Sequence, residues 1–237
     1  MEKIFIMCAG FGWRVKGYSV PKCLLELPDP KGVTTVLARM LSQIEVRGKR
    51  DVVTVVTGYE SQMIKNAFPE LSTLQVSDSK PDRNLLTSIR DVLASTDSDD
   101  YMILLGDTVW SSLGISTLFE DPPSRHINGM AFYGDNKELG EMFAFRSTTK
   151  YGSTILRDVC KNQKELYSCY GHRSTKYLGK TYKVIGFKAS KLNDFYRHTQ
   201  ATVNNKIKKI YVPQVNDIDY DQEYETICKY MKRGYYD

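Results

Sequence analysis

The residues of this chain whose types and spacing could do chemistry begin directly after a short apolar segment at 3–8. That segment, KIFIMC, is typical of a buried strand, and it runs into a loop that contains Gly10 and Gly12. Glycines let backbone N–H groups lie against an anion, because no Cβ stands in the way. Arg14 and Lys22 add two positive charges that suit the same anion. The pattern predicts a phosphate-binding loop.

The glycine pair matches neither of the common nucleotide-binding fingerprints. The Rossmann pattern G-x-G-x-x-G requires a third glycine where Val15 stands, and the P-loop pattern G-x-x-x-x-G-K-[ST] does not occur. A tight turn that only requires glycine explains Gly10 and Gly12 as well as a phosphate site does. The Pro21-Lys22 pair and two acidic elements downstream favour the phosphate site.

The first acidic element is Asp107, which follows an apolar segment at 101–105 and a glycine. This places Asp107 at the carboxyl end of a predicted buried strand. The carboxyl ends of strands line the ligand crevice of an open α/β sheet, where a carboxylate can hold Mg²⁺ against phosphate oxygens. An aspartate that stabilises its own turn is the structural alternative.

The second acidic element is Asp219, just before the last predicted helix. Asp219 with Gln222 three residues on also fits a helix-capping box, which is a purely structural role. Asp217 competes with Asp219 as a metal ligand, because residues two apart share a face of an extended segment.

Length and composition predict one globular domain in a reducing compartment. The chain has 237 residues, 41% hydrophobic and 26% charged, and no apolar run long enough for a membrane span. Its five cysteines form no C-x-x-C pair, which indicates free thiols and a cytoplasmic protein rather than a disulfide framework. The net charge of +5 suits anionic phosphates, and the basic cluster at 206–209 fits a solvated strand edge better than a nucleic-acid site.

The order of the predicted elements indicates an α/β fold with a mainly parallel sheet. In the first half, helical spacing at 33–44, 61–68 and 85–93 alternates with strand-like runs at 51–57, 74–76 and 101–105. In the second half, short strand-like runs come first, at 130–133, 142–146, 154–159 and 181–187. Helical spacing then returns at 191–198 and 224–231. We therefore expect a parallel nucleotide-binding half and a mixed or antiparallel half for a second substrate.

Five segments, in this order, resemble a known family. They are MCAGFGWR…PKCLLEL, VVTGYE, NLLTS, LLGDT and NDIDYDQEYE, and they are similar to the nucleotidylyltransferases of the sugar-1-phosphate and phosphocholine cytidylyltransferase type. The resemblance implies a Rossmann-like, GT-A-like three-layer fold in a single domain at 1–237. It also implies that residues of about 1–125 bind the NTP and residues of about 126–237 bind the acceptor.

The resemblance assigns roles to residues at matching positions. It implies that the glycine loop and its arginine bind the NTP phosphates, that the lysine helps to neutralise the reacting phosphate, and that two aspartates hold Mg²⁺. The residues at these positions are Ala9, Gly10, Gly12, Arg14, Lys22, Asp107 and Asp219. Gly58 and Tyr59 match a segment near the base, and Asn84 and Ser88 match one near the nucleotide in the smaller cytidylyltransferases.

The activity implied is transfer of a nucleotidyl group from an NTP to a phosphorylated small molecule, with release of pyrophosphate. The Asn84-x-x-x-Ser88 element favours CTP, then UTP. Two other functions stay open. Trp13, where the family usually has Ser or Thr, fits a nucleotide-binding regulator without turnover. Asp217-x-Asp219 fits the metal motif of a glycosyltransferase of the same fold.

Overall fold

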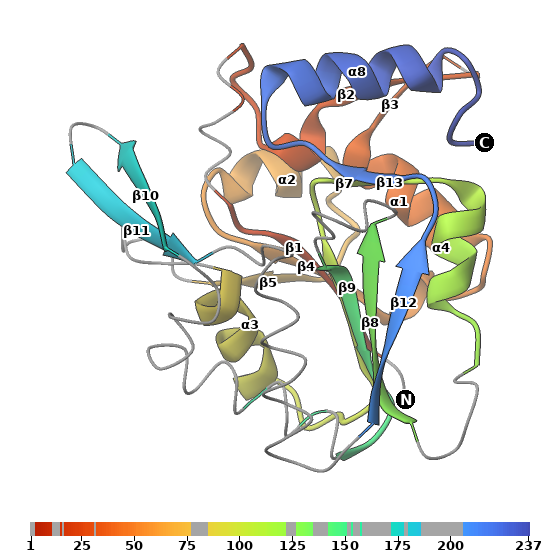
Figure 1. Cartoon of the computed structure of the whole chain (residues 1–237). Coiled ribbons are helices and arrows are strands. Elements are labelled where there is room, and N and C mark those ends of the chain that lie inside the picture. The colour runs from red at the N-terminus through yellow and green to blue at the C-terminus, as the bar shows by residue number, and fades with distance from the viewer. Residues whose placement is uncertain are drawn as a thin grey trace.

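A seven-stranded sheet forms the centre of the molecule (Figure 1). The computed structural model describes residues 3–10, 15, 17–30, 32–76, 85–121, 127–134, 142–150, 153, 157, 172–177, 180–185 and 206–237. The strand order is β12-β8-β9-β6-β1-β4-β5. The strands are Lys3–Cys8 (β1), Val53–Thr57 (β4), Thr73–Gln75 (β5), Tyr101–Leu105 (β6), Ile127–Gly134 (β8), Met142–Ser147 (β9) and Lys206–Val212 (β12).

Only one strand of this sheet runs against its neighbours. β9 pairs antiparallel with β6 and β8, whereas β1 pairs parallel with β4 and β6, β4 with β5, and β12 with β8. β4 and β5 extend the sheet on one side of β1, and β6 extends it on the other. The strand order therefore reverses at β1, and ligands of open α/β sheets bind at the carboxyl ends of the strands at such a point.

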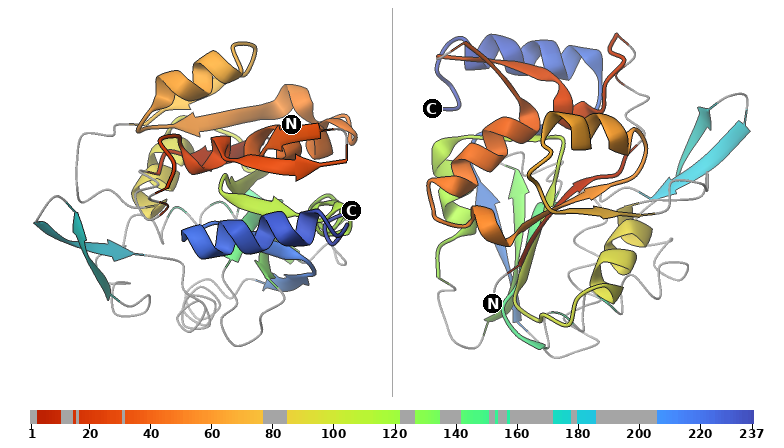
Figure 2. Two further views of the ribbon diagram at one scale, coloured as in Figure 1. Left: turned by 90° about the horizontal axis from the view of Figure 1, so that it is seen from above. Right: turned by 180° about the vertical axis from the view of Figure 1, so that it is seen from behind.

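Helices cover both faces of the sheet, which makes a three-layer α/β fold. The helices α1 (Val36–Glu45), α2 (Ser61–Ala67) and α4 (Ser112–Leu118) pack on one face, and α3 (Leu85–Ala94) packs on the other. Seen from behind, α1 and α2 lie in front of the sheet (Figure 2). The side chains of β1 alternate between these two faces. Ile4 and Ile6 belong to the first core cluster, on the face covered by α1, α2 and α4. Phe5 and Met7 belong to the second core cluster, on the face covered by α3.

Three short antiparallel pairs stand outside the large sheet. They are β2 (Glu26–Asp29) with β3 (Gly32–Thr35), β7 (Thr108–Trp110) with β13 (Val215–Asp217), and β10 (His172–Tyr177) with β11 (Lys180–Ile185). Two 3₁₀ turns span Lys22–Leu24 (η1) and Arg50–Val52 (η2). The last helix is α8 (Asp221–Met231).

The helix α8 joins the start of the chain to its end. It lies beside β2 above the upper edge of the sheet (Figure 1). A third core cluster beneath it contains Val15 and Leu27 from the N-terminal part and Ile218 and Tyr224 from the C-terminal part. The Tyr224 hydroxyl also donates to the carbonyl oxygen of Glu26. The end of the chain therefore supports the segment that carries the glycine loop.

Three of the predicted elements need correction. The strand predicted at 51–57 begins at Val53, because residues 50–52 form η2. The helix predicted from Val33 begins at Val36, because residues 32–35 form β3, and the Val33 side chain is 70% exposed. Thr35 ends the strand and caps α1 by accepting from the backbone N–H of Ala38 at 3.1 Å. In the strand predicted at 154–159, the described residue Arg157 is helical. The other residues of that strand and the helix predicted at 191–198 lie outside the described residues.

Three predictions from composition can be compared with the structure. The basic cluster at 206–209 lies on β12, which is an edge strand of the sheet, as predicted. The cysteines within the described part of the chain, Cys8, Cys23 and Cys228, are free thiols. The part of the chain that the structure describes contains no helix with the length and apolar character that crossing a bilayer requires.

The C-terminal residues contribute directly to stability. The Tyr236 side chain is 1% exposed, its hydroxyl accepts from Asn216 Nδ2 at 2.7 Å, and burial raises its pKa to about 12. We expect Tyr236→Ala to lower the free energy of unfolding by about 4 kcal/mol, because a large buried ring is removed. Urea denaturation measures this loss. Tyr235→Ala is the matched control: its ring is 45% exposed, and the expected loss is below about 1 kcal/mol. Equal losses would contradict the prediction.

Candidate active site

Two glycines hold the end of β1 close to its neighbouring strands. A Cβ at Gly58 would lie 2.9 Å from the carbonyl oxygen of Ala9. A Cβ at Gly106 would lie 2.4 Å from Cys8 Sγ and 2.8 Å from the carbonyl oxygen of Met7. The backbone N–H of Gly106 donates to that same carbonyl at 3.1 Å. These contacts fix the start of the glycine loop against the turn that carries Asp107.

The short β7–β13 ladder brings the second acidic element to the first. Asp217 pairs with Thr108, and the next backbone N–H, that of Ile218, donates to the carbonyl oxygen of Asp107 at 3.0 Å. The Ile218 side chain is fully buried in the third core cluster, which anchors the segment. Asp219 therefore lies beside the Gly106-Asp107 turn, although the two segments are far apart in sequence.

Lys22 is the residue on which both acidic elements converge. Its Nζ donates to Asp107 Oδ2 at 2.9 Å and to Asp219 Oδ1 at 3.0 Å. The side chain of Lys22 is only 10% exposed, and those of Asp107 and Asp219 are 30% and 16% exposed. Partial burial of this kind strengthens charge interactions relative to those in open water. The three side chains form one charged cluster at the carboxyl edge of the sheet.

A 3₁₀ turn holds the lysine in this cluster. η1 begins after Pro21, whose carbonyl oxygen accepts from the N–H of Leu24 at 2.8 Å. Cys23, the next residue, is 3% exposed and packs in the first core. The backbone of Lys22 is thereby anchored on both sides, while its four-carbon side chain reaches the two carboxylates.

Cys8 and Cys23 are buried side by side behind the cluster. The hydrogen bond to Cys23 and burial raise the pKa of the Cys8 thiol well above its ordinary value, and the charge of Asp107 adds to the effect. A thiol whose pKa is raised stays protonated at neutral pH and is a poor nucleophile. Cys8 therefore has a packing role in this site.

The capping role considered for Asp219 is wrong. α8 begins at Asp221 with Tyr220 as the preceding N-cap residue, and the carboxylate that serves this end of the helix belongs to Glu223. Glu223 Oε2 accepts from the backbone N–H groups of Asp219 at 2.8 Å and of Tyr220 at 2.9 Å. The carboxylate of Asp219 is thus directed to Lys22, while its backbone is held by Glu223. Gln222, one residue earlier, does not take this part.

Glu223 is the residue that the sequence analysis missed. Its signal was an acidic residue at the third position of the helix, as in a capping box. Tyr220 stands where Ser, Thr or Asp normally caps a helix, so the pattern was assigned one residue too early. The β7–β13 ladder was missed as well, because each of its strands has three residues.

The other predicted site residues are placed as follows. Ala9 and Gly10 directly follow β1, and Gly58 and Tyr59 directly follow β4, so all four lie at the same edge of the sheet. Ser88 lies on α3 and is 6% exposed. Three predicted site residues lie outside the described residues, namely Gly12, Arg14 and Asn84.

The donor set fits a divalent metal held jointly with phosphates. The described residues include no group of three or more His, Cys, Asp or Glu side chains that could hold a metal alone. Mg²⁺ commonly uses one or two carboxylates together with substrate phosphates and water. Asp107 and Asp219, which already share one cation, meet that requirement.

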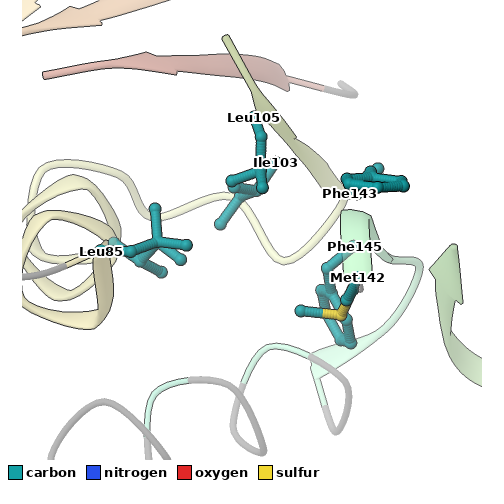
Figure 3. Close-up of a pocket in the computed structure, with 8 residues that line it drawn as sticks. Leu85, Ile103, Leu105, Met142, Phe143 and Phe145 are labelled. Carbon is teal, nitrogen blue, oxygen red and sulfur yellow. The ribbon is translucent and has the colours of Figure 1, made fainter. Parts of the chain in front are cut away.

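An apolar cavity on the α3 side of the sheet is too small to hold a nucleotide. Figure 3 shows the side chains around it, which come from α3, β6 and β9 and include Leu85, Ile103, Leu105, Met142, Phe143 and Phe145. Its volume is about 10 Å³, which is room for one water-sized molecule. We interpret this cavity as a packing gap within the core.

Solved structures with the same fold include several nucleotide-handling proteins. CTP:phosphocholine cytidylyltransferase from Streptococcus pneumoniae is 10% identical, with a TM-score of 0.59 over 97% of this chain and 99% of that one. HddC from Yersinia pseudotuberculosis, complexed with GMP-PN, is 13% identical, with a TM-score of 0.58 over 98% and 100%. Rv0371c from Mycobacterium tuberculosis, complexed with manganese, is 13% identical, with a TM-score of 0.57 over 96% and 97%.

These similarities show the fold, and a family model shows the family. No curated protein matches the sequence. The model of the MobA-like NTP transferase domain matches residues 4–157, which include the glycine loop, Lys22 and Asp107. This match covers more than half of the chain, so the protein belongs to the MobA-like NTP transferase family and is a nucleotidyltransferase.

Proposed function

We propose that this protein transfers a nucleotidyl group from CTP or UTP to a phosphorylated small molecule, such as a sugar phosphate or a phosphocholine-like compound, and releases pyrophosphate. The observation that carries this proposal is the cluster in which Lys22 contacts both Asp107 and Asp219. The cluster lies at the same edge of the sheet as Ala9 and Gly10, which follow β1, and we propose that the nucleotide phosphates bind there.

The reaction joins two anions, and this sets what the site must do. A phosphate oxygen of the acceptor attacks the α-phosphorus, and the bond from that phosphorus to the pyrophosphate oxygen breaks. The attacking oxygen is already negative, so no strong general base is needed. Lys22 supplies positive charge to the phosphates, and the N–H groups near Gly10 orient them. We propose the same phosphate-binding role for Arg14 and Gly12.

We propose Mg²⁺ as the metal that Asp107 and Asp219 hold. A bound divalent ion would neutralise the triphosphate and stabilise charge on the leaving pyrophosphate. The fold relative Rv0371c was solved with manganese, which supports a divalent ion in this fold. We also propose a cytoplasmic location, where the free thiols of Cys8, Cys23 and Cys228 stay reduced.

The two parts of the chain are assigned to different substrates. We propose that residues of about 1–125 bind the NTP, because β1, β4 and β6 and their loops belong to this part. We propose that residues of about 126–237 bind the acceptor. The second part also contributes β8, β9 and β12 to the common sheet and Asp219 to the charged cluster.

Two alternatives make different predictions for the same assay. A regulator without turnover would bind nucleotide but release no pyrophosphate. A glycosyltransferase would use the Asp217-x-Asp219 pair and a nucleotide sugar, whereas the contacts of Lys22 join Asp219 to Asp107. The cluster therefore favours nucleotidyl transfer.

The decisive experiment measures pyrophosphate release from each of the four NTPs with a panel of phosphorylated acceptors and Mg²⁺. Release that requires both the NTP and one acceptor, and that Asp107→Asn abolishes, would support the proposal. Nucleotide binding without release from any pair would favour the regulator. Transfer from a nucleotide sugar would favour the glycosyltransferase.

The choice of base gives a separate prediction. We expect CTP to stabilise the protein against heat most strongly, followed by UTP. At a nucleotide concentration of about 100 times its Kd, binding adds about 2.7 kcal/mol of stability, which raises the Tm of a chain of this size by several degrees. A thermal-shift titration with Mg²⁺ measures this. Stabilisation by GTP or ATP alone would contradict the prediction.

A further inference from the structure

The ammonium group of Lys22 lies between the two carboxylates that would hold a metal ion. Its Nζ lies 2.9 Å from Asp107 Oδ2 and 3.0 Å from Asp219 Oδ1, so one ammonium group bridges the two carboxylates. Mg²⁺ binds oxygen ligands at about 2.1 Å. An ion bound to these same two oxygens would overlap the ammonium group, so the ion and Lys22 cannot both sit between them.

We propose that Lys22 and the divalent ion exclude each other from the Asp107–Asp219 pair, and that the triphosphate relieves this competition by taking the ammonium group. The inference rests on the proposed function, because it assigns the metal to these two aspartates and the phosphates to the glycine loop. It adds that free metal binds weakly and that metal and triphosphate enter together.

The charges of the cluster give the physical reason. Two carboxylates carry a charge of −2, and the contact with Lys22 offsets one of these charges. When the ammonium group moves to a phosphate oxygen, the full charge of both carboxylates faces the metal. The ammonium group of Lys22 and a metal cation beside the same carboxylates would repel each other strongly in this partly buried site. The lysine thus lowers the affinity for metal until a phosphate is present to accept its ammonium group.

The construction of the segment permits this movement. The backbone of Lys22 is fixed by η1 and by the buried Cys23 side chain. The four-carbon stem of a lysine rotates freely and carries a point charge that does not need fixed geometry. We infer that the side chain can turn from the carboxylates toward a phosphate bound at the same edge of the sheet while the backbone stays in place.

The test measures Mn²⁺ binding by electron paramagnetic resonance without nucleotide. We expect Lys22→Met to bind Mn²⁺ at least about tenfold more tightly than the wild type, because the competing charge is gone. Asp219→Asn introduced into Lys22→Met should remove this gain. The matched control is Lys65→Met on α2, which changes the net charge equally and removes only a contact with Gln75. Its affinity for Mn²⁺ should equal that of the wild type.

A second measurement uses the wild-type protein and does not depend on the folding of a variant. We expect Mn²⁺ to increase the labelling of Lys22 by an amine-specific acylating reagent, measured by mass spectrometry, with Lys65 as internal reference. Equal Mn²⁺ affinity in Lys22→Met and the wild type, or labelling of Lys22 that does not rise with Mn²⁺, would overturn the inference. Neither measurement requires turnover, so a failure of the pyrophosphate assay is distinguishable from a failure here.

Discussion

Asp219→Asn should lower turnover by about 1,000-fold while the protein stays folded. The change removes the charge of one of the two carboxylates that we assign to the metal, and loss of one such electrostatic contact at a reacting phosphate costs about 100-fold to 1,000-fold. The fold should lose no more than about 1 kcal/mol, because Lys22 keeps its contact with Asp107 and the new amide oxygen can still accept from it. Pyrophosphate release and urea denaturation measure the two effects.

The matched control is Asp217→Asn, which removes the same charge two residues away. Asp217 lies on β13 opposite Thr108, one step before the segment that reaches Asp107. We expect this variant to keep most of its turnover. Near wild-type turnover in Asp219→Asn would reject the metal assignment. No capping role would remain to explain that result, because Glu223 serves the start of α8. Inactivation by Asp217→Asn alone would transfer the assignment to Asp217.

The elements that sequence predicts well are those with a clear local pattern, which is either a continuous apolar run or a helical spacing of apolar residues. β1 and β6 have the predicted bounds, because each is an apolar run that ends in glycine or alanine-glycine. α3 and α8 show clear helical spacing of apolar residues. The Gly106-Asp107 turn followed from the end of β6, and so its place at the carboxyl edge was predictable.

The contacts that complete the site depend on long-range pairing, which a local pattern does not contain. β7 and β13 are too short to show alternation, yet their ladder brings Asp219 to Asp107. Val33 fits a helical spacing with Val36 by chance, and the pairing of β3 with β2 overrides it. The prediction of Asp107 as a metal ligand came from its place after a strand, and the resemblance paired it with Asp219, whereas the bridge through Lys22 is visible only in the structure.

Gly106→Ala should be the most damaging single-atom change near the site. The added Cβ would lie 2.4 Å from Cys8 Sγ and 2.8 Å from the carbonyl oxygen of Met7, and no real Cβ tolerates such contacts. Because β1 is a central strand, its backbone cannot withdraw easily. We expect a loss of about 3 kcal/mol in the free energy of unfolding and weaker Mn²⁺ binding, since Asp107 follows directly. Urea denaturation and electron paramagnetic resonance measure these effects.

Gly10→Ala is the matched control, because a Cβ at Gly10 would have no heavy atom within 4 Å. Its free energy of unfolding should stay within about 0.5 kcal/mol of the wild type, while nucleotide affinity falls if Gly10 lies against phosphate.

Cys8→Ala separates the two clashes at Gly106. It removes the sulfur but leaves the carbonyl oxygen of Met7, so the Gly106→Ala/Cys8→Ala double variant should recover only part of the lost stability. Such coupling between two substitutions is what contact predicts. Strict additivity of the two losses would contradict the proposed clash with Cys8 and leave the backbone of Met7 as the sole constraint on Gly106.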